Sequence, residues 1–537
     1  MQKTLAILVF VLLGILGLSF RAFSSIDRLA FQAQRDLIGK AKMMPSLGNR
    51  DSSSTIVRST KSYLLADYTK KDTAFLKEKC RQAGLDLGLV VMANRIPTDS
   101  KWVTPMPSEH LLKQSTLDLQ LPMDEKQTEF AVYHSEIFDQ PAYINVLQIG
   151  DELITYRTTE KSGDIQLIYG CVRGAFGTKK YAHPENAIVY KLWDTPERTL
   201  LPDLELQVEM AQAEAKRLAK TDYPLLIFND LKSYAYIQGD SAICSFLDTM
   251  HKYNPDKLLQ ADLLTPASWH YLSRVNENQL WNESMRTKIV ETLTEKQESY
   301  RNNLMPWMIG NFPILLADKN RKATTMEELE WFLSKAAAFD AGFGLLFDIE
   351  AMKKHGLTDD MLNTINIWET LRLAGAFSEE QKEQFKDPYG NWHLEKESDT
   401  IYLLYTQHVS RRYFCHQTEE HWKWYSPYSG RFALRIAVEG KGSVSDLYFR
   451  TPNGILFLPY TLKAGQHLFY NFDGTAFITD LNYNKIEEIH PQGVSFLEEG
   501  LSEITFACEV LPEGQKKPEV TVRYMTRGEA GRMVLPW

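Results

Sequence analysis

The segment Gly342–Glu350, with the sequence GFGLLFDIE, constrains the fold more than any other stretch of this chain. A short apolar run that ends at two acids is typical of a buried parallel strand whose last side chains emerge at the carboxyl edge of a sheet. In barrels and doubly wound folds, this edge is where functional side chains gather. We therefore expect an α/β fold with polar side chains at the carboxyl edge of its sheet.

Asp348 and Glu350 are the first candidate catalytic residues. They lie two positions apart, so a strand that continued through them would place both on one face, about 6–7 Å apart along it. Two carboxylates at that separation suit acid–base or electrostatic catalysis on a sugar acetal. The alternative is that one of them caps a helix over Ala351–His355 while the other is solvated.

A second apolar run, Pro224–Phe228, is closed by Asn229 and Asp230 and follows a helical pattern over Leu204–Lys220. The order of helix, short loop, buried strand and polar terminus is the repeat of an α/β fold. Asp230 is therefore a third candidate catalytic residue, as the partner of the two acids above.

Further strands are predicted from apolar runs of the same kind. They span Ser62–Ala66, which is followed by Asp67, Leu85–Met92, Leu258–Asp262 and Leu304–Gly310, which contains Trp307. Acids at the ends of strands from separate repeats can meet at one mouth only if the sheet closes or nearly closes. This favours a (β/α)8 TIM-type barrel over a flat sheet. Asp67, Asp262 and Trp307 are then candidate substrate-binding residues.

Helical patterns accompany these strands. The segment Thr324–Glu328, with the sequence TTMEE, is a capping-box start for a helix that runs through Ala338 and leads into the Gly342–Glu350 run. Another helix is predicted over Asp359–Leu373. The repeat ends at about 388, where Asp387–Asn391 has the composition of a loop and marks a domain boundary.

At about 120–195 the α/β pattern is interrupted by short alternating strands. Gly150-Asp151 and a second turn at Lys161–Asp164 fit tight connections between them. Arg173 begins a glycine-containing turn and His183 follows it, but no Lys-Ser/Thr pair opens a helix there, so the turn is not a phosphate loop. Arg173 and His183 are either a structural cluster or part of a substrate-binding rim.

After Trp392 the chain changes to short alternating strands separated by Gly/Pro turns, which is typical of an all-β sandwich. An aromatic cluster precedes its first clear strand. The cluster is either a platform that stacks on sugar rings or part of the core between two sheets. Its members are Trp422, Trp424, Tyr425 and Tyr428.

Composition excludes several classes. A net charge of −9 argues against a nucleic-acid groove, which needs a basic stripe. The 5 cysteines are scattered without a Cys-x-x-Cys motif, so we expect buried thiols rather than a disulfide framework. We find neither a His-Glu-x-x-His motif nor a Gly-x-Ser-x-Gly elbow, and we expect no metal and no cofactor.

The chain begins like an exported protein. Lys3 precedes an apolar segment, Leu5–Leu18, and Ala22 and Ser24 fit a cleavage site. The apolar segment is shorter than the about 20 residues of a membrane-spanning helix. We therefore expect a periplasmic, cell-surface or extracellular protein that meets a membrane only through this segment if it stays uncleaved.

The 537 residues are expected to form two large domains after a short leader. The predicted boundaries are a signal peptide at 1–24, a lead-in segment at 25–60, a barrel at 61–388 with its β-rich insertion at 120–195, and a carbohydrate-binding-like sandwich at 392–537.

This organisation resembles that of secreted glycoside hydrolases from polysaccharide-degrading bacteria, which often use Asp or Glu at the ends of barrel strands. The resemblance lies in architecture and in the Asp-x-Glu at Asp348 and Glu350, and no family-defining signature is matched. It implies hydrolysis of a polysaccharide or glycoconjugate, with carbohydrate as the partner. Two alternatives remain: a non-catalytic glycan-binding protein with a degenerate barrel, and a structural protein of the cell envelope.

Overall fold

The structure is a computed structural model, and it divides into two compact units, Val90–Leu272 and Met1–Leu89 with Ser273–Trp537. No helix in the described part is long and apolar enough to cross a membrane. The predicted signal segment, 1–24, lies outside the described residues. The structure describes residues 29–33, 36–37, 58–59, 62–67, 86–92, 94–133, 135–140, 142–229, 231, 239–266, 268–276, 286–302, 308–319, 321–347, 349–414 and 419–535.

The first half of the unit Val90–Leu272 is built from two small antiparallel sheets with hydrophobic cores. Gly150, at a φ of +54°, lies in the turn that joins β8 to β9, and Gly163, at +62°, lies in the turn that joins β10 to β11. One sheet contains β6 (Lys113–Asp118), β12 (Ile188–Leu192), β8 (Val146–Ile149) and β9 (Glu152–Thr155), and the other contains β10 (Thr158–Ser162), β11 (Ile165–Tyr169) and β7 (Phe130–Tyr133).

The second half of this unit is a β–α–β arrangement. Asp203 caps α3 (Leu204–Ala219), which precedes β13 (Leu225–Asn229). β14 (Leu258–Ala261) pairs with β13 in parallel, and α5 (Gly239–Tyr253) connects the two. The carboxyl ends of these two strands therefore share one edge.

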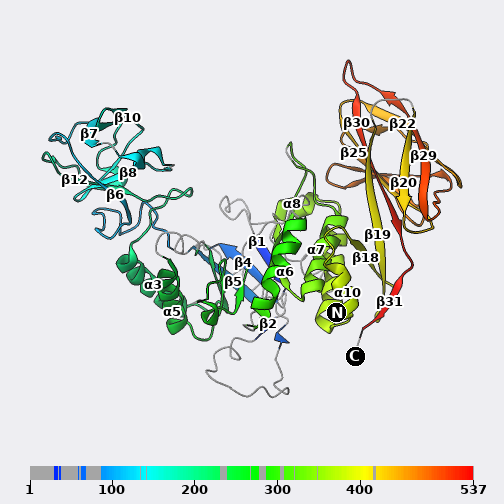
Figure 1. Cartoon of the computed structure of the whole chain (residues 1–537), viewed down its shortest axis with the longest axis horizontal. Helices are drawn as coiled ribbons and strands as arrows, with labels where there is room; N and C mark the ends of the chain where they lie inside the picture. Colours follow the sequence, from blue (N-terminus) through cyan, green and yellow to red (C-terminus); the bar gives the residue numbers. More distant parts are fainter. Residues whose placement is uncertain are drawn as a thin grey trace. The chain divides into compact units, whose positions relative to one another are not determined.

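In the other unit, β16 (Met308–Ile314) and β17 (Gly342–Phe347) form a second parallel pair, joined by α7 (Met326–Phe339). The predicted capping box is present: the Thr325 hydroxyl accepts from the Glu328 N–H, and the Glu328 carboxylate accepts from the Thr325 N–H. The helices around this pair are α6 (Arg286–Asn302), α8 (Ile349–Lys354), α9 (Thr358–Ala374) and α10 (Glu379–Phe385) (Figure 1).

The (β/α)8 barrel is not confirmed. β1 (Leu29–Ala33) pairs antiparallel with β17 and also with β4 (Ser62–Asp67), so the sheet of this unit is mixed. All strands of a TIM barrel are parallel. The local patterns predicted the strands and helices, but a segment expected to be only a lead-in, 25–60, supplies a strand that runs against its neighbours.

The C-terminal region is an all-β sandwich, as predicted. Its two antiparallel sheets enclose one hydrophobic core (Figure 1). The helix-facing sheet, named for its contact with α7 and α9, contains β18 (Asn391–Lys396), β19 (Ile401–Phe414), β30 (Pro518–Arg527), β21 (Ala433–Gly440), β25 (Gln466–Tyr470), β26 (Ala476–Asp480) and β27 (Lys485–Ile489), with β31 (Gly531–Val534) paired to β19. The outer sheet contains β20 (Glu419–Ser426), β29 (Gly500–Leu511), β22 (Ser443–Thr451), β23 (Gly454–Leu458) and β28 (Gln492–Gly493), with β24 (Leu462–Lys463) paired to β22.

The aromatic cluster before the first clear strand belongs mainly to this core. Trp422 and Trp424 are buried, and the ring of Trp424 stacks on Tyr524 with centroids 3.7 Å apart. Tyr425 points the other way and is 53% exposed. The core interpretation is therefore correct for the two tryptophans.

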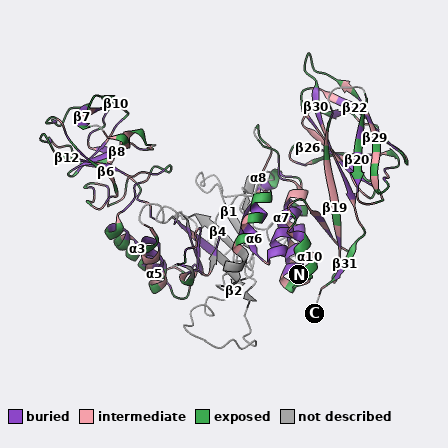
Figure 2. Cartoon of the chain, in the orientation of Figure 1, coloured by how far each residue is buried: buried purple, intermediate pink, exposed green. Residues whose placement is uncertain are grey.

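Helix α7 is buried on all sides (Figure 2). It packs against β16, α9, α10 and β18. Its Glu330 carboxylate accepts hydrogen bonds from the Leu394 N–H at 3.0 Å and from the Trp368 indole at 3.3 Å, and it pairs with His393 at 2.7 Å. A polar residue on a buried helix thus ties the α/β part of this unit to the sandwich.

Candidate functional site

The predicted catalytic acids cannot share one strand face as expected. Asp348 and Asp230 lie outside the described residues, as does Trp307. β17 ends at Phe347, and Glu350 lies in the first turn of α8. The expectation of a strand that continues through Glu350 is therefore wrong.

Two of the predicted substrate-binding acids, Asp67 and Asp262, lie at strand ends as expected. Asp67 is the last residue of β4. Asp262 follows β14, is 7% exposed, and accepts a hydrogen bond from the Leu231 N–H at 3.1 Å. Since Leu231 follows β13 by two positions, Asp262 links the segments that leave the carboxyl ends of two parallel strands.

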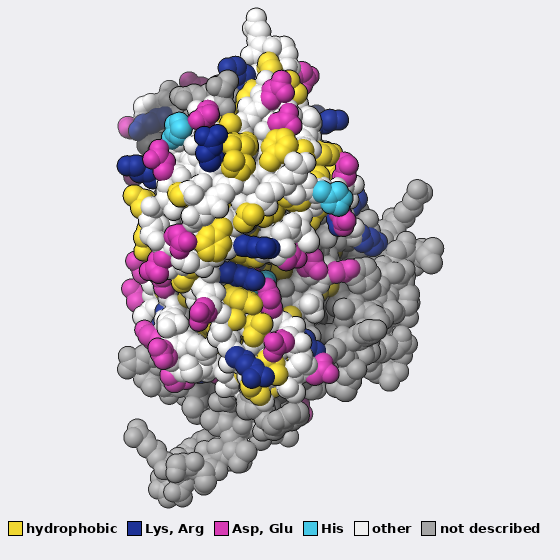
Figure 3. Space-filling view, turned by 90° about the vertical axis from the view of Figure 1, so that its right-hand side faces the viewer, with side chains coloured by type: hydrophobic (Ala, Val, Ile, Leu, Met, Phe, Trp, Pro, Cys, Tyr) yellow, Lys and Arg dark blue, Asp and Glu magenta, His cyan; other side chains and the backbone are white. Residues whose placement is uncertain are grey.

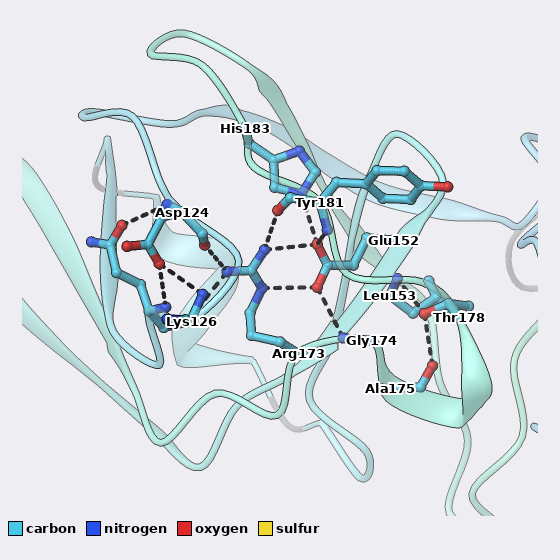
Figure 4. Close-up of polar contacts among 11 residues, drawn as sticks. Asp124, Lys126, Glu152, Leu153, Arg173, Gly174, Ala175, Thr178, Tyr181 and His183 are labelled. Carbon is cyan, nitrogen blue, oxygen red and sulfur yellow. Dashed lines mark hydrogen bonds and ion pairs between the residues drawn. The ribbon is translucent and has the colours of Figure 1, made fainter.

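Arg173 and His183 meet at a residue that the sequence did not single out, Glu152 (Figure 4). Arg173 donates to both Glu152 oxygens at 2.8 Å, and His183 Nε2 lies 2.8 Å from Oε2. The N–H groups of Gly174 and Tyr181 also donate to the carboxylate, at 2.9 and 3.1 Å. We call these residues the Glu152 cluster.

The Glu152 cluster is buried and saturated. Glu152 is 0% exposed, and the remaining Arg173 N–H groups donate to the carbonyl oxygens of Asp124, Gln127 and Tyr181. Burial alone raises the pKa of Glu152, but the hydrogen bonds from His183 and Arg173 outweigh it and hold the pKa at about 2. A permanently charged carboxylate with every acceptor filled favours the structural alternative for Arg173 and His183 over a substrate-binding rim.

The turn after Arg173 requires glycine at position 174. The φ of Gly174 is +60°, and an added Cβ would lie 2.6 Å from the Thr178 carbonyl oxygen. A side chain would therefore displace the turn that presents the Gly174 N–H to Glu152.

A different group of polar side chains lines a pocket of about 210 Å³ between the start of α7 and the helix-facing sheet. We call it the arginine pocket. Alternate residues of this sheet face the core or the helices. The core-facing set includes Leu434, Ile436 and Val522. The arginine pocket is lined by Lys322, Thr325, Met326, Glu327, Leu357, Arg411, Arg435, Ile436, Ala437, His467, Phe469, Asn471, Phe477, Tyr483, Thr521 and Arg523.

The arginine pocket lies on the carboxyl side of the parallel pair β16 and β17. α7 begins after the carboxyl end of β16, and Leu357 follows α8, which itself follows β17. These two connections are joined because His355 Nε2 lies 3.0 Å from the Thr324 carbonyl oxygen. The pocket is thus at the sheet edge where the sequence predicted functional side chains.

Tyr483 closes one side of the arginine pocket and is held by a close backbone approach. The Gly356 N–H donates to the Asn482 carbonyl at 2.8 Å, and a Cβ at position 356 would lie 2.1 Å from the Tyr483 carbonyl oxygen. Only glycine permits this contact. Burial raises the pKa of Tyr483, so its phenol stays neutral.

Charge in the arginine pocket is unbalanced. Among the described residues that line it, Glu327 is the single acid, and Arg435 Nε lies 3.6 Å from Glu327 Oε1. Burial raises the pKa of Glu327, but the guanidinium groups of Arg435 and Arg523 outweigh it and hold this pKa below its usual range. The pocket therefore pairs one carboxylate with three arginines, Arg411, Arg435 and Arg523.

Sequence reasoning missed this pocket because no local pattern marks it. Its arginines come from three strands, β19, β21 and β30, and become neighbours only through strand pairing. The one available signal was Arg435, an arginine within the apolar alternation of Arg431–Val438.

The described residues contain no group of three or more His, Cys, Asp or Glu side chains that could hold a metal ion.

No protein-family model matches the chain, and no curated protein matches it. Among solved structures, it is similar to a GH36 α-galactosidase from Geobacillus stearothermophilus in complex with stachyose, at 10% identity and a TM-score of 0.31, covering 81% of this chain and 46% of that one. The chain thus spans about half the length of this enzyme.

Two further similar structures are a debranching enzyme from Nostoc punctiforme and an α-amylase from Lactobacillus plantarum. The first has 11% identity and a TM-score of 0.26, covering 81% of this chain and 79% of that one. The second has 10% identity and a TM-score of 0.26, covering 81% and 82%. These proteins are glycoside hydrolases by name, but TM-scores this low do not establish a shared fold or activity.

Proposed function

We propose that this protein is a carbohydrate-active protein that binds a saccharide in the arginine pocket. The observation behind the proposal is the composition of that pocket at the carboxyl side of β16 and β17. Phe469 and Phe477 stack in parallel, with centroids 5.0 Å apart, and His467 and Asn471 add hydrogen-bonding groups beside them. Aromatic rings that line a pocket beside hydrogen-bonding groups suit a ligand with both C–H groups and hydroxyls.

The leading form of the proposal is hydrolysis of a polysaccharide or glycoconjugate by an exported enzyme. Asp348 and Glu350 would supply the general acid and the nucleophile or base. Asp67 and Trp307 would line the subsites. Export rests on the segment 1–24.

A second candidate is a glycan-binding protein that does not cut its ligand. The position of Glu350 in the first turn of α8 favours it, because a carboxylate there already has a structural reason to be present.

The test is hydrolysis of a panel of plant, algal and bacterial polysaccharides by the full chain, measured as release of reducing ends. We expect Asp348→Asn and Glu350→Gln to lower turnover by about 10²–10⁴-fold while saccharide binding persists. Binding without any hydrolysis would establish the second candidate. A chain that neither binds nor cuts any saccharide would overturn the proposal and leave a structural role in the cell envelope.

A further inference from the structure

Three arginines of the arginine pocket form one straight row across the helix-facing sheet. Arg411 on β19 is directly opposite Arg523 on β30, and Arg523 is directly opposite Arg435 on β21. The row continues with Phe469 on β25 and Phe477 on β26. We call these five residues the Arg–Phe row. With neighbouring strands about 4.8 Å apart, it extends for about 19 Å.

Like charges directly opposite each other destabilise a sheet, so three arginines in register carry a cost for folding. Two contacts of Arg435 offset part of it. Glu327 is the one acid among the described pocket residues, and Arg435 is further stabilised by its position over the Phe469 ring, 4.5 Å from the centroid. The pocket retains an excess of positive charge in a chain whose net charge is −9.

The fourth basic residue of the pocket does not alter this balance. Lys322 forms an ion pair with Glu439 at 2.5 Å, outside the row. The excess of positive charge therefore belongs to the guanidinium groups, which bind carboxylate and sulfate oxygens through paired N–H donors.

Neutral groups complete the pocket. Burial, with a contribution from the nearby Lys322, lowers the pKa of His467 to about 4, so its imidazole is uncharged near neutral pH. Its Nδ1 is buried and has no hydrogen-bond partner among the residues that the structure describes.

The outer sheet differs in its charge distribution. On the side of the sandwich where β20, β22 and β29 lie, basic and acidic side chains are mixed with hydrophobic ones (Figure 3). A surface of mixed sign does not select an anion.

We propose that the saccharide bound in the arginine pocket is acidic, and that its carboxylate or sulfate group binds the three arginines of the Arg–Phe row. This inference rests on the proposed carbohydrate function and specifies its ligand class, namely a uronate or a sulfated sugar.

The experiment compares matched ligands by isothermal titration calorimetry on the full chain. The probes are uronate oligosaccharides with their methyl esters, and sulfated oligosaccharides with their desulfated counterparts. We expect at least one acidic form to bind and its neutral counterpart to bind at least about tenfold more weakly, since the neutral form lacks the charged hydrogen bonds to the arginines. A neutral form that binds equally well would overturn the inference and leave the carbohydrate function intact.

Three variants locate the effect. Arg411 is exposed, so Arg411→Gln leaves the sandwich core unchanged, and we expect it to weaken binding of the acidic form at least about tenfold. Arg435→Gln should weaken it further. Arg431, exposed and outside the pocket, supplies the matched control Arg431→Gln, which should bind like the wild type.

A final probe, inorganic sulfate, distinguishes anion binding by the arginines from saccharide binding. Inorganic sulfate should raise the Tm of the wild-type chain but raise that of Arg435→Gln much less. If no saccharide binds in either form while sulfate retains this arginine-dependent effect, the carbohydrate function is overturned and the anion site stands. If acidic saccharides bind equally well to Arg411→Gln and Arg435→Gln, the Arg–Phe row is not their site.

Discussion

Both the Glu152 cluster and the arginine pocket bring glutamate and arginine together, but the two sites differ in the ratio of acidic to basic side chains. In the cluster, one carboxylate receives five hydrogen bonds, and the guanidinium of Arg173 finds acceptors on every side. Among the described residues that line the pocket, Glu327 is the one acid beside three guanidiniums, and it pairs with Arg435. A saturated cluster stabilises the fold and has no remaining capacity for a ligand. An unbalanced pocket has that capacity.

The two sites also differ in how deeply their ion pairs are buried. Glu152 and Arg173 have exposed side-chain fractions of 0% and 2%, whereas Glu327 and Arg435 retain 16% and 25%. Complete burial makes an ion pair costly to break, because the remaining partner is left charged in a region without water. Partial exposure lets solvent or a ligand compensate such a loss. Changes in the two sites should therefore differ strongly in their effect on stability.

The largest expected effect is that of Glu152→Gln. It leaves Arg173 charged and buried without its carboxylate, and we expect a destabilisation of about 3–5 kcal/mol in the β-rich part of Val90–Leu272. Hydrogen exchange of the amides in β8, β9 and β11 of the full chain measures it. Glu185→Gln, at an exposed position of the same unit, is the control. Equal protection in the two variants would show that the cluster does not hold these sheets together.

Low pH should remove the stabilisation that the ionised Glu152 carboxylate contributes. The pKa of Glu152 is lowered from 4.5 to about 2, so the stabilisation, about 3 kcal/mol, is fully present above pH 4.5 and is lost as the pH falls through about 2. The difference in stability between wild type and Glu152→Gln should therefore narrow between pH 4.5 and 2. Urea unfolding across this range measures the difference. A difference in unfolding free energy that stays constant over this pH range would mean that Glu152 is not charged in the folded protein.

The other unit should respond to alkali instead. Burial lowers the pKa of His393, but the charge and hydrogen bond of Glu330 outweigh it and raise the pKa to about 10. This contribution is fully present below pH 6.5 and is lost as the pH rises through about 10. Hydrogen exchange of α7 and β18 should quicken over that range beyond the intrinsic rate. His393→Gln should abolish the extra pH dependence, and a variant that keeps it would contradict the assignment.

A smaller effect on stability than that of Glu152→Gln is expected for Glu327→Gln, since the side chains of Glu327 and Arg435 keep exposed fractions of 16% and 25%. Its effect on binding should be opposite in sign. Removing the acid makes the pocket more positive, so an acidic saccharide should bind several-fold more tightly. Glu380→Gln is the matched control, because Glu380 has the corresponding position in the first turn of α10. Weaker binding by Glu327→Gln would show that Glu327 contacts the ligand.

Sequence patterns predicted the local features of both regions. Apolar alternation located the strands, the Thr325–Glu328 spacing predicted the start of α7, and the composition of Gly150-Asp151 predicted a turn. These features depend on neighbouring residues only. The strand end at Phe347 was placed too late because Asp348-Ile349-Glu350 fits a strand by alternation as well as it fits a first helical turn.

Features that depend on strand pairing were not predictable. The antiparallel position of β1 beside β17 departs from the expected parallel barrel, yet nothing in Leu29–Ala33 specifies a direction. Glu152 resembles any acid at the start of a strand until the turn after Arg173 folds over it. The Arg–Phe row requires five strands in register, and its residues are spread from Arg411 to Arg523.

The central claim is that the arginines of the pocket are available to a ligand while Arg173 is not. NMR of the full chain with ¹⁵N-labelled arginine reports on each Nε–H group during titration with an acidic oligosaccharide and with its methyl ester or desulfated counterpart. The account predicts that the signals of Arg411, Arg435 and Arg523 shift with the acidic form only, and that the signal of Arg173 stays fixed. Bound saccharide with unchanged signals from all three pocket arginines, or with a shifted Arg173 signal, would contradict it.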